Sequence, residues 1–148
     1  MDEEVLSAMR KQVEAEPYAR KLALSLIEVK PGYALVEMTP QDDTGNIFGM
    51  THGGAIFSLI DEAFQVSCNA HGTIAVALNM TITYHHPPER RSVLRAESKE
   101  IHRARKTATY EIKVTDDHHN LIASCMAIAY RKKEKLPFLG ESYAADDL

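Results

Sequence analysis

Hydrophobic residues cluster most densely just before the middle of the chain, in a stretch that predicts one long helix. Between positions 55 and 66 they cover nearly the whole circumference of a helix, as Ala55, Ile56, Phe57, Leu59, Ile60, Ala63, Phe64 and Val66. A helix that is apolar all round is buried in a protein core. We expect this helix to run from about Gly53 to Asn69 or Ala70, and Gly72 to end it, because glycine is favoured just beyond a helix.

Alternating apolar and polar positions predict β-strands on both sides of this helix. The ranges that indicate strands are 21–29, 33–39, 75–84, 92–103, 107–115 and 121–131. In the third range, one face would carry Val76, Leu78, Met80, Ile82 and Tyr84. The strands are mostly joined by short turns and do not alternate with helices, which argues against a parallel sheet. We therefore predict an α+β fold, in which a curved antiparallel sheet wraps around one long central helix.

Two terminal segments flank this predicted core. Residues 3–16 indicate a charged amphipathic helix, with Val5, Met9 and Val13 spaced by four, and Pro17 ends it. This helix would act as a lid or a packing element. The end of the chain is charged and then acidic, which is typical of a loose tail. We divide the chain into an N-terminal helical segment (1–20), one domain (21–133) and a C-terminal tail (134–148).

Composition and charge narrow the classes of function. A chain of 148 residues accommodates one domain with a sizeable core. The net charge of −4 gives no general attraction to nucleic acid, and no apolar run approaches the ~20 residues of a membrane span. The N-terminal residues lack the features of a signal peptide, and Cys68 and Cys125 fit small buried hydrophobes better than a disulfide. We expect a cytoplasmic protein with no nucleic-acid or membrane partner.

Asp61 is the first candidate for chemistry, because a carboxylate on such an apolar helix is costly to bury without compensation. It could act as a general base that deprotonates water, or as a nucleophile that attacks an acyl carbon. The structural alternative is a buried carboxylate that caps a neighbouring loop or binds a surface partner. Burial would raise its pKa, and nearby N–H donors would lower it, so the sequence leaves this balance open.

The start of the helix is the second candidate site. Gly53 and Gly54 leave the first backbone N–H groups uncovered, and the helix dipole adds positive potential there, so a negative oxygen would bind well. The alternative is a tight turn that needs glycine for backbone reasons alone. His52 precedes the glycines and has two possible roles, as an acid that contacts substrate or as a residue that fixes the loop.

These residues together resemble the His-Gly-Gly segment of hotdog-fold acyl-CoA thioesterases of the phenylacetate-degradation (PaaI-like) type. The matching positions are Asn46, Gly49, His52, Gly53, Gly54, Leu59 and Asp61. A weaker resemblance covers about residues 21–130. It implies the hotdog fold, hydrolysis of an acyl-CoA thioester without a bound cofactor, and a homodimer that commonly pairs into a homotetramer. Asn46 would then donate its amide to the same oxygen as Gly53, although an isolated Asn in a loop is more often a turn residue.

One departure from the family concerns the attacking water. Some relatives place a Ser or Thr on the strand after the helix to hold that water, and the corresponding residue here is Ala77. The position of the attacking water would therefore depend on Asp61 and its other neighbours, or the Asp61 carboxylate would attack the acyl carbon directly.

Basic residues gather in three short stretches, which are 90–91, 103–106 and 131–133. They are either solvated turns and strand ends or a cradle for the phosphates of coenzyme A, with Arg90 and Arg105 as its candidates. Metal is not expected. Neighbouring residues on a strand point to opposite faces, so neither His85-His86 nor the pair 118–119 offers two ligands to one ion.

We therefore predict an acyl-CoA thioesterase in which Asp61 is the base or nucleophile and Gly53, with Asn46, polarises the carbonyl. The remaining candidates for substrate contact are His52, Gly54, Phe48, Ile56, Phe57, Met80, Arg90 and Arg105. Two rivals share the fold. A non-catalytic acyl-CoA sensor would not need Asp61 near the carbonyl, and a hydratase would want an Asp/His pair in one loop, which is not found.

Overall fold

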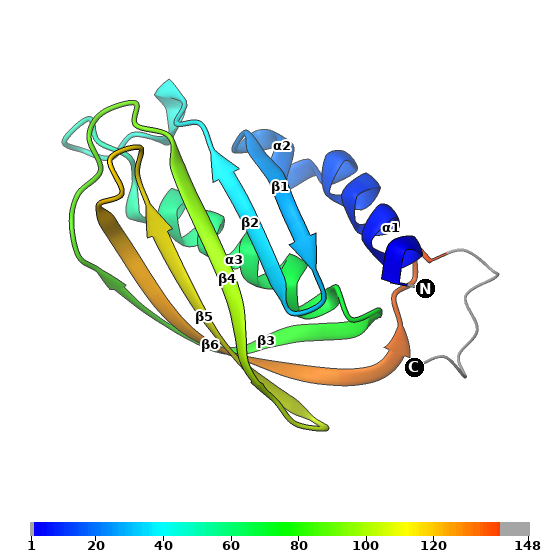
Figure 1. Ribbon diagram of the computed structural model, residues 1–148. Helices are drawn as coiled ribbons and strands as arrows, with labels where there is room; N and C mark the ends of the chain where they lie inside the picture. Colours follow the sequence, from blue (N-terminus) through cyan, green and yellow to red (C-terminus); the bar gives the residue numbers. More distant parts are fainter. Residues whose placement is uncertain (1, 140–148) are drawn as a thin grey trace.

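The protein forms one antiparallel sheet that curls around a long helix, as seen in a computed structural model that describes residues 2–139 (Figure 1). The elements in chain order are α1 (Asp2–Ala15), α2 (Pro17–Lys21), β1 (Leu24–Lys30), β2 (Tyr33–Met38), the 3-10 turn η1 (Asp42–Thr44), α3 (Gly53–Asn69), β3 (Thr73–Tyr84), β4 (Leu94–Arg103), β5 (Thr107–Thr115) and β6 (Leu121–Lys135). The six strands lie in the order β1-β2-β4-β5-β6-β3, so β1 and β3 are the edges. This confirms the predicted α+β architecture.

The core lies between α3 and the facing side of the sheet. Leu59, Ile60 and Ala63 are fully buried on the helix, and the inward residues of β5 are buried opposite them. The Phe64 and Tyr110 rings meet edge to face, with 5.5 Å between their centroids. The predicted alternation of β5 is confirmed, because its buried residues are Ala108, Tyr110, Ile112 and Val114.

The expectation that α3 is buried on all sides is wrong. One stripe of the helix is open in the single chain, and it carries Gly54, Phe57, Ser58, Asp61 and Gln65. These residues recur every three or four positions, so they lie on one face. The sheet covers the other faces. The Asp61 side chain therefore lies at the surface of the single chain and not in its core.

The predicted face of the β3 strand is also only partly correct. The pairing of β3 with β6 shifts between Ala77 and Asn79, which marks a bulge at Leu78. An extra residue in one strand turns the side chains that follow to the opposite face. Val76 is consequently exposed on the outer face, whereas Met80 and Ile82 pack against the core.

The N-terminal segment folds back onto the main domain. Val5, Met9 and Val13 are buried, which confirms the predicted amphipathic helix. Pro17 ends α1, but it also opens the short helix α2, because proline suits the first turn of a helix. The first strand consequently begins at Leu24 rather than at residue 21.

The last strand is longer than expected and ends beside α1. It runs to Lys135, and Leu136 and Leu139 are then buried in the same cluster as the apolar face of α1. The expected loose tail therefore does not begin at residue 134, because β6 and the buried residues that follow it continue past that point, and the remainder of that prediction, residues 140–148, lies outside the described residues. Among residues 2–139, no helix has both the length and the apolar character to span a membrane.

Candidate active site

His52 sets up the start of α3. It is the N-cap residue, and its Nδ1 accepts a hydrogen bond of 2.7 Å from the Gly54 N–H. In the neutral ring the proton must then sit on Nε2. The contact also accounts for glycine at position 54, because an added Cβ would lie 3.0 Å from His52 Nδ1. The geometry therefore favours the loop-fixing role of His52.

Gly53 is the first residue of α3, and no backbone reason requires glycine there. It is absent from the glycines with positive φ, and an added Cβ would make only ordinary contacts of 3.6 Å with Tyr84. The Tyr84 hydroxyl donates a hydrogen bond of 3.0 Å to the Gly53 carbonyl, which holds the turn in place. Among the described residues, none accepts a hydrogen bond from the Gly53 N–H. This N–H is therefore a free donor at the positive end of the helix.

Asn46 closes the loop that leads to this helix start. Its Oδ1 accepts hydrogen bonds of 2.9 Å from the Phe48 N–H and 3.0 Å from the Met50 N–H. Asn46 is thus a turn residue, as the structural alternative predicted. Two backbone donors on Oδ1 fix the amide orientation, so the Nδ2 group points away from these bonds. The same side chain can therefore order the loop and offer N–H donors to a ligand.

Asp61 lies beside a pocket of about 330 Å³ that is formed by the open stripe of α3 and by the junction between α1 and α2. Desolvation by the surrounding protein raises the pKa of Asp61, and the negative charge of Glu16 raises it further. A carboxylate with a raised pKa is a stronger base, which suits it to accept a proton from water.

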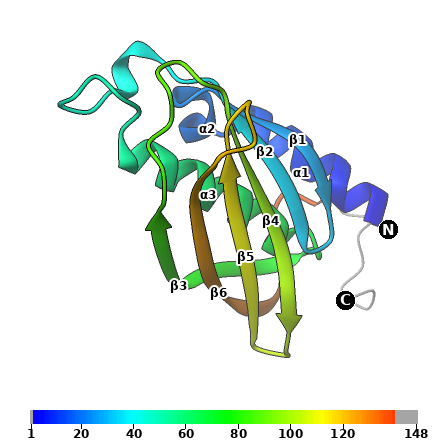
Figure 2. The same ribbon diagram turned by 60° about the vertical axis from the view of Figure 1, so that its left-hand side comes forward.

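The apolar residues that the sequence proposes for substrate contact do not gather around Asp61 within one chain. Only Phe57 lines the pocket there. Ile56 is a core residue, and Met80 packs against the core. Phe48 is 77% exposed on the loop between β2 and α3, which projects from the body of the protein (Figure 2).

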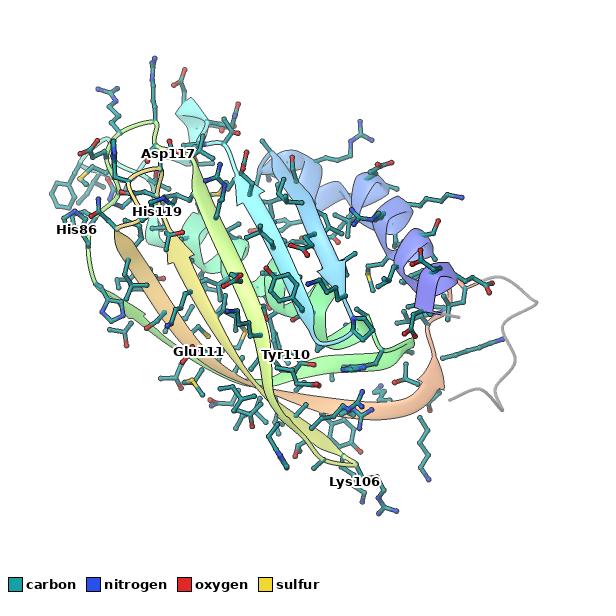
Figure 3. The ribbon with its side chains drawn as sticks, viewed as in Figure 1. His86, Lys106, Tyr110, Glu111, Asp117 and His119 are labelled. Carbon is teal, nitrogen blue, oxygen red and sulfur yellow. The ribbon has the colours of Figure 1, made fainter. Side chains whose placement is uncertain are left out.

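The basic candidates lie at opposite ends of the sheet. Arg90 lines a hollow of about 370 Å³ together with Asn46 and the loop around it. Arg105 lines another hollow, of about 440 Å³, with Lys106 and residues 130–134. Figure 3 shows Lys106 at the β4–β5 turn and His86 at the opposite end of the sheet. One chain therefore offers two separate basic sites, of which only the one with Arg90 adjoins Asn46.

The cysteines do not contribute a nucleophile. Both are free and buried, and burial raises the pKa of Cys68 to about 12 and that of Cys125 to about 11. A protonated thiol is neither a good nucleophile nor a metal ligand.

Sequence reasoning missed several residues near the site. Tyr84 was placed only on a strand face, and Glu16, Tyr18 and Glu62 were not considered. A signal was present for Glu62, because it adds a second carboxylate to a helix that is otherwise apolar.

Comparison with known proteins adds independent evidence. The sequence model of the Thioesterase superfamily matches residues 48–123 of this chain. A protein from Archaeoglobus fulgidus is 40% identical over 112 residues, which cover 76% of this chain and 73% of that protein. The acyl-coenzyme A thioesterase PaaI of Escherichia coli is 32% identical over 74% of this chain and 79% of its own. A solved structure of the E. coli PaaI protein superposes with a TM-score of 0.85 at 27% identity, covering 90% of this chain and 97% of that one.

We predict that His52→Ala lowers the free energy of unfolding by about 1 kcal/mol, the usual effect of removing a helix N-cap. The reason is that the Gly54 N–H loses its acceptor. Urea denaturation measures the change, with His86→Ala as the control because that side chain is exposed. Equal stability of the two variants would show that the His52 contact does not stabilise the helix start.

Proposed function

Because this chain belongs to the thioesterase superfamily, we propose that it hydrolyses an acyl-CoA thioester at a site shared by two subunits, with Asp61 from one and Gly53 from the other. Its hotdog fold and its likeness to the PaaI proteins agree with a PaaI-like thioester hydrolase. The observation that carries the proposal is the free Gly53 N–H at the positive end of the same helix that carries Asp61.

Gly53 would stabilise the carbonyl oxygen of the thioester. As the acyl carbon becomes tetrahedral, that oxygen gains negative charge, and a fixed N–H at a helix N-terminus stabilises it. Asn46 supports the same oxygen through its Nδ2 group, since its Oδ1 is already occupied. His52 and Gly54 shape the turn that presents Gly53.

Asp61 would supply the base or the nucleophile. As a base it takes a proton from water while the water oxygen bonds to the acyl carbon. The C–S bond then breaks, and the coenzyme A thiolate leaves with the electron pair and takes up a proton. As a nucleophile its carboxylate attacks the acyl carbon instead, the C–S bond breaks to release the thiolate, and water then hydrolyses the mixed anhydride to the free acid and the Asp61 carboxylate.

Two chains are needed because one helix cannot bring both groups to one carbon. Gly53 and Asp61 are eight residues apart on α3, which is ~12 Å of axial rise. Reacting groups approach to roughly 3–3.5 Å. Two helices packed antiparallel around a two-fold axis would place the start of one beside the middle of the other.

The sheet offers a surface for such a dimer. The 12-residue strand β3 is an edge strand, and residues 76–79 are exposed on it. An exposed edge strand is a template for pairing with another chain. A larger assembly, the expected homotetramer, would cover the apolar outer face of the sheet, which carries Val76, Ile101, Met126, Ile128 and Tyr130.

Several finer points remain predictions from the sequence. Arg90, Arg105 and their basic neighbours are candidates for the coenzyme A phosphates. The absence of a cofactor and the cytoplasmic location are expectations. The runner-up function is a non-catalytic acyl-CoA sensor. Thiol release from a panel of aromatic, medium-chain and keto acyl-CoA thioesters distinguishes the two, since a sensor would bind members of the panel without turnover.

We expect Asp61→Asn to lower kcat on the best thioester by roughly 10²–10⁴-fold, the contribution of a general base. The amide is nearly isosteric but accepts no proton at neutral pH. Circular dichroism confirms that the variant is folded. Wild-type turnover by a folded variant would rule out this role for Asp61.

Exhaustive chelation should leave the activity unchanged. Among residues 2–139, no group of three or more His, Cys, Asp and Glu side chains is placed to hold a metal ion. The assay compares enzyme dialysed against EDTA with untreated enzyme. Activity that is lost on chelation and restored by zinc or manganese would contradict this prediction.

Mixing two inactive variants tests the shared site. Gly53→Pro removes the N–H but suits the first helical position, and Asp61→Asn removes the base. After dissociation and reassociation, a mixed dimer holds one intact site and one doubly defective site. About a quarter of all sites should then recover. Mixed dimers confirmed by mass but without activity would mean that each site belongs to one chain.

A further inference from the structure

The N-terminal segment, residues 2–21, forms one wall of the pocket around Asp61. Glu16 and Tyr18 from the junction of α1 and α2 face the open stripe of α3 across this pocket. The Tyr18 hydroxyl lies 2.9 Å from Ser58 Oγ on the stripe. The apolar face of α1 is buried in the core, so the wall is held by apolar packing as well as by polar contacts.

Gln65 joins this segment to α3 through two carboxyl groups. Its Nε2 donates hydrogen bonds of 2.9 Å to Glu16 Oε2 and 3.0 Å to Glu62 Oε1. In the part of the chain that the structure describes, no basic side chain forms an ion pair with either carboxyl or with Asp61. Both carboxyl groups accept from one amide nitrogen, and two ionised carboxylates held there would repel, which favours a proton on one of them.

Burial decides which carboxyl is neutral. Glu62 is only 4% exposed, and a charged form without water or a cation is strongly disfavoured. Burial raises the pKa of Glu62 well above its usual range, and the hydrogen bond and negative charge of Glu16 raise it further. Three other titratable groups lie around these carboxyl groups: Tyr18 lines the same pocket, and Cys68 on α3 and Cys125 on β6 interact with Asp61. Both thiols are protonated at neutral pH and supply no compensating charge.

We propose that Glu62 is a positioning residue for the hydrolysis, in which its neutral acid donates a hydrogen bond to Glu16 and, with Gln65, holds the Glu16 carboxylate facing Asp61. This inference rests on the proposed role of Asp61. The consequence is chemical, because the charge of Glu16 adds to desolvation in raising the pKa of Asp61, which makes Asp61 a stronger base. The N-terminal segment then contributes a charge to the site as well as packing against the core.

The test compares pH profiles of kcat/KM for full-length variants on the thioester that the panel identifies as best. Glu16→Gln removes the charge, so the pKa of Asp61 falls and the acid limb of the profile moves to lower pH. Glu62→Ala removes the hydrogen bond that holds Glu16, so the acid limb also moves to lower pH. In this variant kcat/KM should fall about ten-fold, the order expected for losing a hydrogen bond to a charged group. Glu62→Gln keeps a neutral donor and should retain the wild-type limb and most of the activity.

Glu14→Gln is the matched control, because it removes one negative charge from an exposed position of α1, two residues before Glu16. Its profile should match the wild type. Urea denaturation of each variant separates altered chemistry from lost stability. If Glu62→Ala does not fold, Glu16→Gln and Glu62→Gln still decide the question.

Two results would overturn the inference. One is an acid limb that does not move in Glu16→Gln. The other is a Glu62→Gln variant as inactive as Asp61→Asn, which would make Glu62 an ionised participant in the reaction. Failure of the proposed function is separate, because it shows as full activity of Asp61→Asn whatever the Glu62 variants do.

Discussion

The burial of α3 against the sheet is the constraint on which the rest of the structure depends. The apolar residues of this helix fill the concave side of the sheet, and Leu59, Ile60 and Ala63 are fully buried there. Because the core holds the helix rigidly, its N-terminal N–H groups and its open stripe have fixed directions. The site residues are therefore positioned by packing, and the two chemical groups of the helix stay ~12 Å apart.

That packing is the reason for proposing a site shared by two chains. A helix packed into a core cannot bend to bring Gly53 and Asp61 together, so the proposed site takes one of the two groups from a two-fold partner. The bulge in β3 fits this view. It turns Val76 outward and leaves a 12-residue edge strand whose exposed part lies at residues 76–79. A bulge of one residue thus leaves this segment of the edge strand exposed, where the proposed dimer would form.

The N-terminal segment shows how remote parts of a chain supply a site. Its apolar face packs beside Leu136 and Leu139 at the other end of the chain, which sets the position of Glu16 and Tyr18 over α3. The effect on Asp61 follows from that placement, since desolvation and, after it, the charge of Glu16 raise the pKa of Asp61. The charged segment that the sequence suggests is a lid or a packing element thus contributes Glu16, and its continuation contributes Tyr18, to the wall of the pocket.

The sequence alone determined the central helix and most of the strands, because the periodicity of apolar residues is a local property of the chain. It also identified Asn46, Gly53 and Asp61 as candidate site residues, through the spacing of their motif. The hydrogen bond of His52 to the helix start was one of two roles that the sequence left open. Only the tertiary structure revealed the open stripe of α3, the bulge at Leu78 and the meeting of Glu16 with Glu62. These depend on which segments cover which faces. Residues 16 and 62 are distant in sequence, and no local pattern predicts that packing brings both carboxyl groups to the side-chain amide of Gln65.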